Sequence, residues 1–351
     1  MSAQKQQRVF VTGATGYIGS RFTEFALREG YAVHGLSRSE SGTAKLRALG
    51  AVPVKGDLSS LDVLRAEAAQ ADVVVHLADA WIDDFSQPYD NVVKIDAAAV
   101  DAMLPFHPPY VDSVVDSGGG GGAIQAAGLA QSKSQRKLFL GTSGIGVVEP
   151  SADGGETDEG AAANKSPLNG RIRCERHVLS KAGDNGIRVA VMRLPPFVYG
   201  RGGSGVRLFL GTFAKLGFVV RVGKGLARTS VVHVDDAARA YVLALRRAGN
   251  DAARARDVYN VASTTQVNFR EFTDAMAAAM GFDVREMSTA EAAATAGPLI
   301  AGFFSDRVRG NSDKARRELG WAPVEEGIIE DIRTGSYVEV AKALKGAAAG
   351  A

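Results

Sequence analysis

Short apolar runs alternate with amphipathic stretches along the first half of the chain. Each run has three to six residues, the length of strands that a parallel sheet buries on both faces. The stretches between the runs repeat apolar residues with the period of helices that cover such a sheet. We expect strands at residues 9–11, 32–36, 52–54, 72–77, 137–140 and 189–194. The alternation predicts the α/β class, with a doubly wound, mostly parallel sheet.

Three glycines follow the first predicted strand at intervals of three residues. Gly13 permits a tight turn, Gly16 lets the backbone approach a pyrophosphate without a Cβ in the way, and Gly19 lets the next helix pack closely on the sheet. The amides at that helix N-terminus attract an anion. A plain strand-to-helix turn would also use glycine, but the place of this turn, between a first strand and an amphipathic helix, favours a dinucleotide site.

The Gly-x-x-Gly-x-x-Gly spacing resembles the nucleotide-binding loop of the short-chain dehydrogenase/reductase superfamily. Later segments resemble an atypical member of its extended, NAD-dependent epimerase/dehydratase-like type, and the likeness spans nearly the full length. These segments are residues 56–58, 76–79, 195–200, 223–236, 259–262 and 311–323. The resemblance implies a Rossmann-type cofactor-binding domain at residues 1–199 and a smaller C-terminal substrate-binding region at residues 200–351.

The second predicted strand ends at Ser37-Arg38, where dinucleotide-binding folds place the residue that reads the adenosine ribose. A guanidinium suits a 2′-phosphate, and Ser37 could donate a further hydrogen bond, so we expect NADP(H) as the cofactor. Arg38 could instead be a solvated surface residue. Asp57 would accept from the adenine amine, or could cap the next helix. The resemblance implies cofactor contacts from Gly13, Thr15, Gly16, Tyr17, Ile18, Gly19, Ser37, Arg38, Asp57, Leu58, Leu77, Ala78, Arg171, Pro195 and Val198.

The fifth predicted strand leads into Gly141-Thr142-Ser143-Gly144 at the carboxyl edge of the sheet, where open α/β folds bind ligands. Reductases and epimerases of the superfamily place a serine or threonine here that hydrogen-bonds the substrate oxygen, and Ser143 matches it. In the alternative, Ser143 only satisfies a turn amide.

The superfamily next uses Tyr-x-x-x-Lys at a helix start, with the tyrosine as proton donor. This motif is absent here. We expect the corresponding helix at residues 166–179, and alignment on Glu175 places Arg171 at the lysine position and Pro167 at the tyrosine position. A guanidinium stays protonated, so Arg171 would act as an electrostatic clamp and not as an acid. The acid would then be Tyr199, unless it is only a packed aromatic residue, or Asp79, which stands where the family has a small residue, or water.

Basic and acidic residues nearly cancel, at 41 and 39, without a long run of one sign. We therefore expect a small-molecule substrate and no nucleic-acid or membrane partner. A single cysteine fits a reducing compartment, and no apolar run reaches the roughly 18 residues of a membrane span. We expect a soluble, cytoplasmic protein without a metal, and a homodimer stays open. We interpret His76 as a core residue, and His233 with Asp235 and Asp236 as structural residues at a helix start.

These residues predict an NADP(H)-dependent oxidoreductase that acts on a small or medium carbonyl, alcohol or activated double bond. Two alternatives stay open, a cofactor-assisted epimerase, dehydratase or other lyase/isomerase, and a non-catalytic NADP(H)-binding sensor. A loop at about 105–122, which ends in five successive glycines, resembles an insertion into the fold, either a lid or an exposed spacer.

Overall fold

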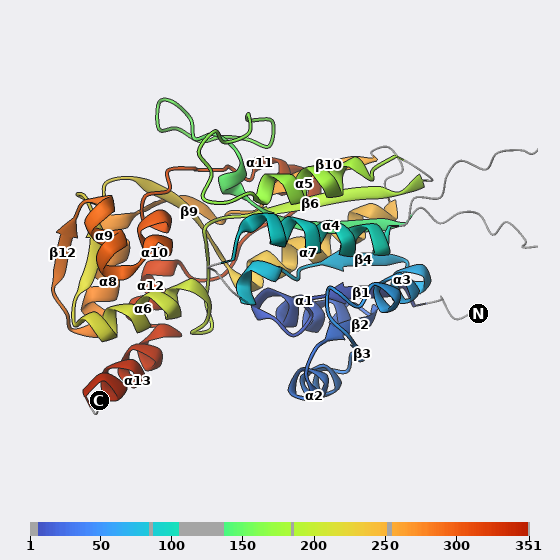
Figure 1. The fold of residues 1–351 in the computed structure, drawn as a ribbon, viewed down its shortest axis with the longest axis horizontal. Coiled ribbons are helices and arrows are strands. Elements are labelled where there is room, and N and C mark those ends of the chain that lie inside the picture. The colour runs from blue at the N-terminus through green and yellow to red at the C-terminus, as the bar shows by residue number, and fades with distance from the viewer. Residues whose placement is uncertain (1–5, 84–86, 105–136, 184–185, 251–254, 350–351) are drawn as a thin grey trace, which may run out of the picture.

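The computed structural model describes residues 6–83, 87–104, 137–183, 186–250 and 255–349. The predicted insertion at about 105–122 lies outside these ranges. A seven-stranded sheet in the order β10-β6-β5-β4-β1-β2-β3 forms the centre of the molecule (Figure 1), and each of its strand pairs is parallel. Its strands are β1 (Arg8–Thr12), β2 (Ala32–Ser37), β3 (Val52–Lys55), β4 (Val73–His76), β5 (Leu138–Gly144), β6 (Arg188–Leu194) and β10 (Arg256–Asn260). The predicted doubly wound parallel sheet is confirmed.

Helices cover both faces of this sheet, because successive strand residues point to opposite sides. Val9 and Val11 pack with Phe22 and Tyr241 on the face of α1 and α7. Phe10 lies in a second core on the face of α3, α4 and α5. The helices around the sheet are α1 (Tyr17–Arg28), α2 (Glu40–Leu49), α3 (Leu61–Gln70), α4 (Tyr89–Met103), α5 (Arg171–Ser180), α7 (Val234–Asn250) and α11 (Asp313–Leu319), with 3₁₀ turns η1 (Ala80–Asp83) and η2 (Ile145–Val147).

A second unit, shown at the left of Figure 1, contains two small sheets and a group of helices. One sheet has the order β11-β9-β7, and the other pairs β12 with β8. Phe197 centres its core, with its ring 5.0–6.0 Å from five other phenylalanine rings. The elements are β7 (Phe197–Tyr199), α6 (Ser204–Leu216), β8 (Val219–Val222), β9 (Arg228–His233), β11 (Thr264–Asn268), α8 (Phe269–Met280), β12 (Val284–Met287), α9 (Thr289–Ala296), α10 (Pro298–Phe303), α12 (Ile328–Arg333) and α13 (Tyr337–Ala349).

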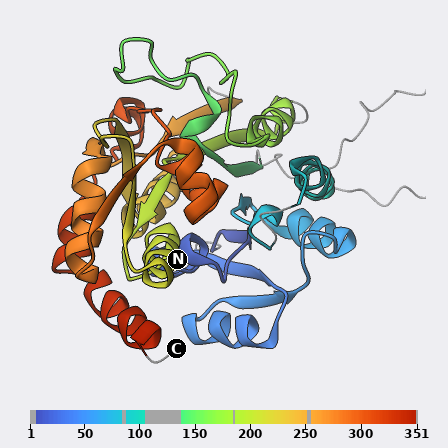
Figure 2. The same ribbon diagram turned by 60° about the vertical axis from the view of Figure 1, so that its left-hand side comes forward.

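The two units interleave along the chain, whereas the prediction divided them after residue 199. β10 pairs with β6 in the first sheet, and α7 packs against α1, although both elements follow residue 200. In Figure 2 most of the orange and red C-terminal helices lie at the left, and the blue N-terminal helix at the bottom lies beside the end of the last red helix. The part of the chain that the structure describes contains no helix that is both long and apolar enough to cross a membrane.

The carboxyl edge of the sheet brings the predicted site segments together. Thr12 pairs with His76, and His76 pairs with Gly141, so the three strands reach this edge in one row. Two local predictions need correction. Ser143 lies inside β5 and not in a turn after it, and α5 begins at Arg171, so Pro167 precedes the helix.

Candidate functional site

The turn between β1 and α1 is built around close backbone contacts. Gly13 has φ +70°, and a Cβ there would stand 2.7 Å from the amide nitrogen of Ala78. A Cβ on Gly19 would stand only 2.0 Å from the carbonyl oxygen of Gly13. Gly16 differs from both, because its φ of −70° suits any residue and a Cβ would meet only the Gly13 oxygen, at 3.1 Å. The space in front of the α1 N-terminus is therefore left free at Gly16, as the approach of a pyrophosphate requires.

A buried polar chain supports this turn from below. The Thr12 hydroxyl lies 2.7 Å from Nδ1 of His76, and Nε2 of His76 lies 3.0 Å from Oδ1 of Asp96. Thr12 also accepts a hydrogen bond from the Ala78 amide at 3.3 Å. Burial raises the pKa of the Asp96 carboxyl, but its hydrogen bond to His76 and the charge of that ring outweigh burial and hold the pKa below its usual value. The structure agrees with the prediction that His76 is a core histidine, since both ring nitrogens have partners.

The adenosine end of the predicted site has two exposed cations. Arg38 follows β2 directly, and Lys45 of α2 donates to the carbonyl oxygen of Thr15 at 2.9 Å. The predicted donation from Ser37 needs correction, because its buried hydroxyl donates to the Ser39 carbonyl at 3.0 Å. Oδ1 of Asp57 binds the serines of its own turn, and these bonds lower the pKa of the carboxyl.

Arg171 is the centre of the predicted catalytic end. As the first residue of α5, it donates from Nη1 to Oδ2 of Asp79 at 2.9 Å and from Nη2 to the carbonyl oxygen of Thr142 at 2.6 Å. Oδ1 of Asp79 accepts from the Trp81 amide at 2.9 Å. The structure thus joins Arg171 and Asp79, which we predicted separately. Both oxygens of Asp79 already accept hydrogen bonds, an arrangement that suits an ion-pair partner and not the predicted proton donor.

The hydroxyls of Ser143 and Tyr199 differ in their hydrogen bonding. The Ser143 hydroxyl is buried, and it has no hydrogen-bond partner among the described residues. Tyr199 is 1% exposed, and its hydroxyl donates to the carbonyl oxygen of Glu326 at 2.7 Å. This burial and this hydrogen bond favour the alternative in which Tyr199 is a packed aromatic residue, because its proton is already donated within the protein. Burial also raises the pKa of this tyrosine.

The other predicted contact residues mostly pack in the cores. Tyr17 connects the two units, since its hydroxyl donates to the carbonyl oxygen of Gly200 at 2.7 Å. Partly buried residues that pack on the cores are Ile18, Leu58, Leu77 and Val198. Two residues near the site were missed by sequence reasoning, Lys45 and Tyr89. Neither belongs to a motif, and each reaches the site from a helix that follows another strand.

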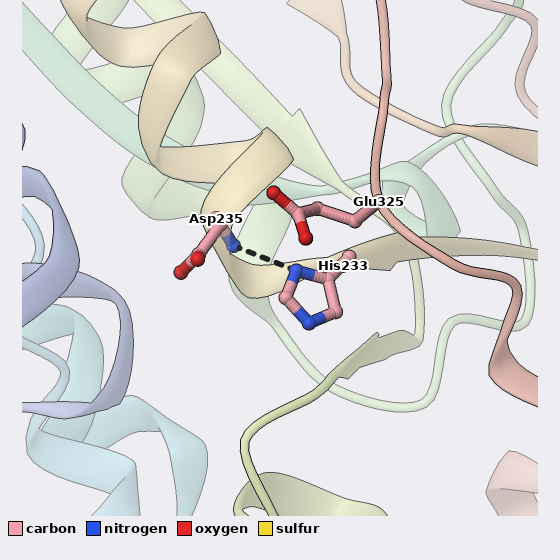
Figure 3. A group of neighbouring side chains, drawn as sticks. All are labelled: His233, Asp235 and Glu325. Atoms are coloured by element: carbon pink, nitrogen blue, oxygen red, sulfur yellow. Dashed lines mark hydrogen bonds between the residues drawn. The ribbon is translucent and has the colours of Figure 1, made fainter. Parts of the chain in front are cut away.

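One group of possible metal ligands lies at the junction of the two units (Figure 3). The ligand atoms of His233, Asp235 and Glu325 lie within 4.8 Å of one another. Nδ1 of His233 accepts from the Asp235 amide at 3.2 Å, and Glu325 pairs with Arg239. Asp235 pairs with Arg21 at 2.7 Å and with Arg201 at 2.6 Å. These arginines form ion pairs with both carboxylates and compensate their charge.

The same junction determines the charge state of Asp235. Burial alone would raise the pKa of its carboxyl, but the hydrogen bonds from Arg201 and Arg21 lower it to about 2. The residue therefore links β9 and α7 to α1 as an ionised carboxylate.

Comparison with known proteins agrees with this architecture. The model of the NAD dependent epimerase/dehydratase family matches residues 9–262. The chain is 28% identical to an uncharacterized protein of Schizosaccharomyces pombe, over 94% of this chain and 99% of that protein. It is 27% identical to 4-hydroxy-2-methyl-3-oxo-4-farnesyl-3,4-dihydroquinoline-1-oxide ketoreductase of Stigmatella aurantiaca, over 90% of this chain and 92% of that protein.

Among solved structures, UDP-glucuronic acid 4-epimerase of Bacillus cereus superposes with a TM-score of 0.67 at 17% identity, over 96% of this chain and 100% of that chain. The dTDP-glucose 4,6-dehydratase of Bacillus anthracis, in complex with NAD, superposes with a TM-score of 0.66 at 16% identity, over 96% of this chain and 97% of that chain. At these identities the likeness concerns the fold alone.

Proposed function

The chain belongs to the NAD dependent epimerase/dehydratase family, and from this premise we propose that it is an NADP(H)-dependent oxidoreductase acting on a small or medium carbonyl, alcohol or activated double bond. The observation that carries the proposal is the pair of cations beside the glycine turn. Arg38 stands where an acidic residue would select NAD(H), and Lys45 reaches the same turn through Thr15. Two cations at this place favour a cofactor with a 2′-phosphate.

The residues at the carboxyl edge of the sheet can bind the cofactor and orient the substrate. A bound nicotinamide supplies or accepts the hydride. Arg171 is fixed by Asp79 and by the Thr142 carbonyl, and its permanent charge can hold a ribose hydroxyl or a substrate oxygen. The unpartnered hydroxyl of Ser143 remains a candidate donor to the substrate oxygen. The ketoreductase among the relatives supports the choice of net oxidoreduction.

A second candidate is a cofactor-assisted epimerase or dehydratase. The family description and the epimerases and dehydratase of similar fold favour it. In such an enzyme the cofactor is restored in each turnover, so product accumulates without net consumption of NADPH. Tight binding of NADPH with neither consumption nor product would instead support a non-catalytic sensor.

The test combines binding and turnover. The purified protein is titrated with NADPH and NADH, and is then incubated with NADPH and a panel of aldehydes, ketones and enones while the absorbance of the reduced cofactor is followed. We expect tighter binding of NADPH and steady consumption with at least one carbonyl. Arg38→Asp should reverse the preference, because a carboxylate repels the 2′-phosphate and accepts from a free hydroxyl. Equal or tighter binding of NADH by the wild-type protein would refute the NADP(H) assignment.

A further inference from the structure

Tyr89 brings an aromatic hydroxyl to the Arg171 site from a helix that the superfamily motif does not use. It is the first residue of α4, and its ring packs edge-on against Trp81 at 5.7 Å. Gly170, the last residue before α5, also lies close to this ring. A Cβ on Gly170 would stand 3.0 Å from the Tyr89 ring. The ring therefore packs beside the start of α5, next to Arg171.

The hydroxyl of Tyr89 is unsatisfied. Its oxygen is buried, and it makes no hydrogen bond of normal geometry to any residue that the structure describes. A buried polar group without a partner costs about 1–3 kcal/mol, so such groups are normally paired. The Arg171 guanidinium interacts with the oxygen of this hydroxyl, but the O–H proton has no acceptor among the described residues. At the ligand-binding edge of an open α/β sheet, such a proton indicates that its acceptor is a bound molecule.

The surroundings keep the Tyr89 hydroxyl protonated. Burial raises the pKa of the Tyr89 hydroxyl, and Asp79 and Cys174 act in the same direction, while the charge of Arg171 lowers it. The group is therefore protonated at neutral pH. Once the proton has left, the phenolate faces the Arg171 guanidinium, which favours the charged form.

We propose that Tyr89 is a catalytic residue that donates the proton to the carbonyl oxygen of the substrate. This inference rests on the proposed oxidoreductase function. In the reduction, the O–H bond of Tyr89 breaks and its proton bonds to the carbonyl oxygen, while the carbonyl carbon takes a hydride from NADPH. The products are an alcohol, NADP⁺ and a phenolate, and the phenolate regains a proton from water. Tyr89 thus replaces the tyrosine whose place in the motif is taken by Pro167.

Kinetics of Tyr89→Phe test the role directly. The variant removes only a hydroxyl whose proton has no acceptor among the described residues, so the fold should survive. With NADPH and a carbonyl that the wild-type protein reduces, kcat should fall by about 10²- to 10⁴-fold, the usual contribution of general acid catalysis, with KM for NADPH nearly unchanged. The alkaline limb of the pH profile should disappear. The control, Tyr31→Phe, changes a tyrosine between α1 and β2 and should keep the wild-type profile.

A spectroscopic titration tests the same placement without turnover. Tyrosine ionisation is followed by absorbance in the wild-type protein and in Tyr89→Phe, each with and without NADP⁺. The difference between the two proteins isolates Tyr89. The positive nicotinamide of NADP⁺ should move this ionisation to lower pH, because a nearby positive charge favours the phenolate. No movement would mean that the hydroxyl does not face the cofactor, and would overturn the inference.

The two measurements separate the two proposals. If no carbonyl of the panel consumes NADPH, the oxidoreductase proposal fails, while the titration still decides whether Tyr89 faces the nicotinamide. If carbonyls are reduced but Tyr89→Phe keeps kcat within twofold of wild type, the oxidoreductase stands and the role of Tyr89 is refuted. Should the variant fail to fold, uniform substitution of tyrosine by 3-fluorotyrosine, a more acidic phenol, replaces it. The alkaline limb then moves to lower pH if a tyrosine is the donor, and stays in place if none is.

Discussion

Gly16 and Gly19 give a matched test of the glycine turn, because a side chain at each position would meet different surroundings. At Gly16 a Cβ would touch only the Gly13 carbonyl oxygen, at 3.1 Å, and the backbone is in a conformation that any residue adopts. Gly16→Ala should therefore change the free energy of unfolding by about 1 kcal/mol or less. At Gly19 the Cβ would stand 2.0 Å from the same oxygen. Gly19→Ala forces the main chain to move, at a cost of about 1–3 kcal/mol or more.

A substitution at Gly16 should have little effect on stability but should strongly weaken NADPH binding. A side chain there occupies the space through which a pyrophosphate reaches the amides at the α1 N-terminus. Each hydrogen bond to a charged group is worth about 1.5–3 kcal/mol. Loss of one such bond raises the Kd for NADPH by roughly 10- to 150-fold, and Gly16→Val should lose more than Gly16→Ala.

Two measurements on each variant check this reasoning. Calorimetric titration with NADPH gives the Kd, and urea unfolding without cofactor gives the stability. We expect Gly16→Val to be folded but unable to bind, and Gly19→Ala to be destabilised before any cofactor is added. Wild-type affinity in Gly16→Val would place the pyrophosphate elsewhere. An equal loss of stability in Gly16→Ala and Gly19→Ala would refute the geometric argument.

Three further predictions concern polar groups that are buried or half-buried. Glu175 and Arg193 form a buried pair with contacts of 2.6 and 3.0 Å. Glu175→Leu alone should cost about 3–5 kcal/mol in urea unfolding, whereas adding Arg193→Met should recover most of the loss; a double variant as unstable as the single one would contradict this. Burial raises the pKa of Asp306, and the Val308 amide opposes it only in part. The stabilisation that comes from protonating Asp306 is complete below the pKa that this carboxyl has in the unfolded chain. It is lost as pH rises through the pKa that the carboxyl has in the folded protein. Asp306→Asn should hence increase stability at neutral pH and change little in acid, as unfolding at several pH values would show. Ser143→Ala should keep wild-type stability, since its hydroxyl has no described partner. If that hydroxyl orients the substrate oxygen, turnover falls by about 10²- to 10³-fold; unchanged turnover on a genuine substrate would exclude the role.

Six of the seven strands of the central sheet were predictable, because each of them is a short apolar run in the sequence. An apolar run such as residues 9–11 is buried on both faces, and the glycines after it mark the turn into α1. Strand ends were less certain, and β5 extends to Gly144, since glycine and serine carry no strand signal. The start of α5 was also missed, because proline is common in a first helical turn, whereas Pro167 here lies in the preceding loop.

The features that the sequence did not predict depend on contacts between residues that are distant in sequence. The pairing of β10 with β6 crosses the predicted domain boundary, and no local pattern encodes it. Tyr199 followed β6 at a suitable place for an acid, yet the backbone of Glu326, which lies 127 residues later, determines what its hydroxyl binds. Tyr89 and Lys45 were missed for the same reason, since each reaches the site only through the packing of its helix.

If Arg171 stands at the lysine position of the family motif, as the resemblance implies, a proton donor from a different helix is consistent with its chemistry. Burial lowers the pKa of the Arg171 guanidinium, but Asp79 and Asp96 outweigh burial and hold the pKa above its usual range, so the group cannot pass a proton along. Its guanidinium instead donates to two acceptors at once, the Asp79 carboxylate and the Thr142 carbonyl oxygen. A fixed cation of this kind stabilises a negative oxygen next to it, whichever element supplies that oxygen. Tyr89 of α4 places a buried hydroxyl beside this cation, and the proton of that hydroxyl has no acceptor among the described residues. The loss of the motif tyrosine is then compatible with retained acid catalysis, with reprotonation coming directly from water.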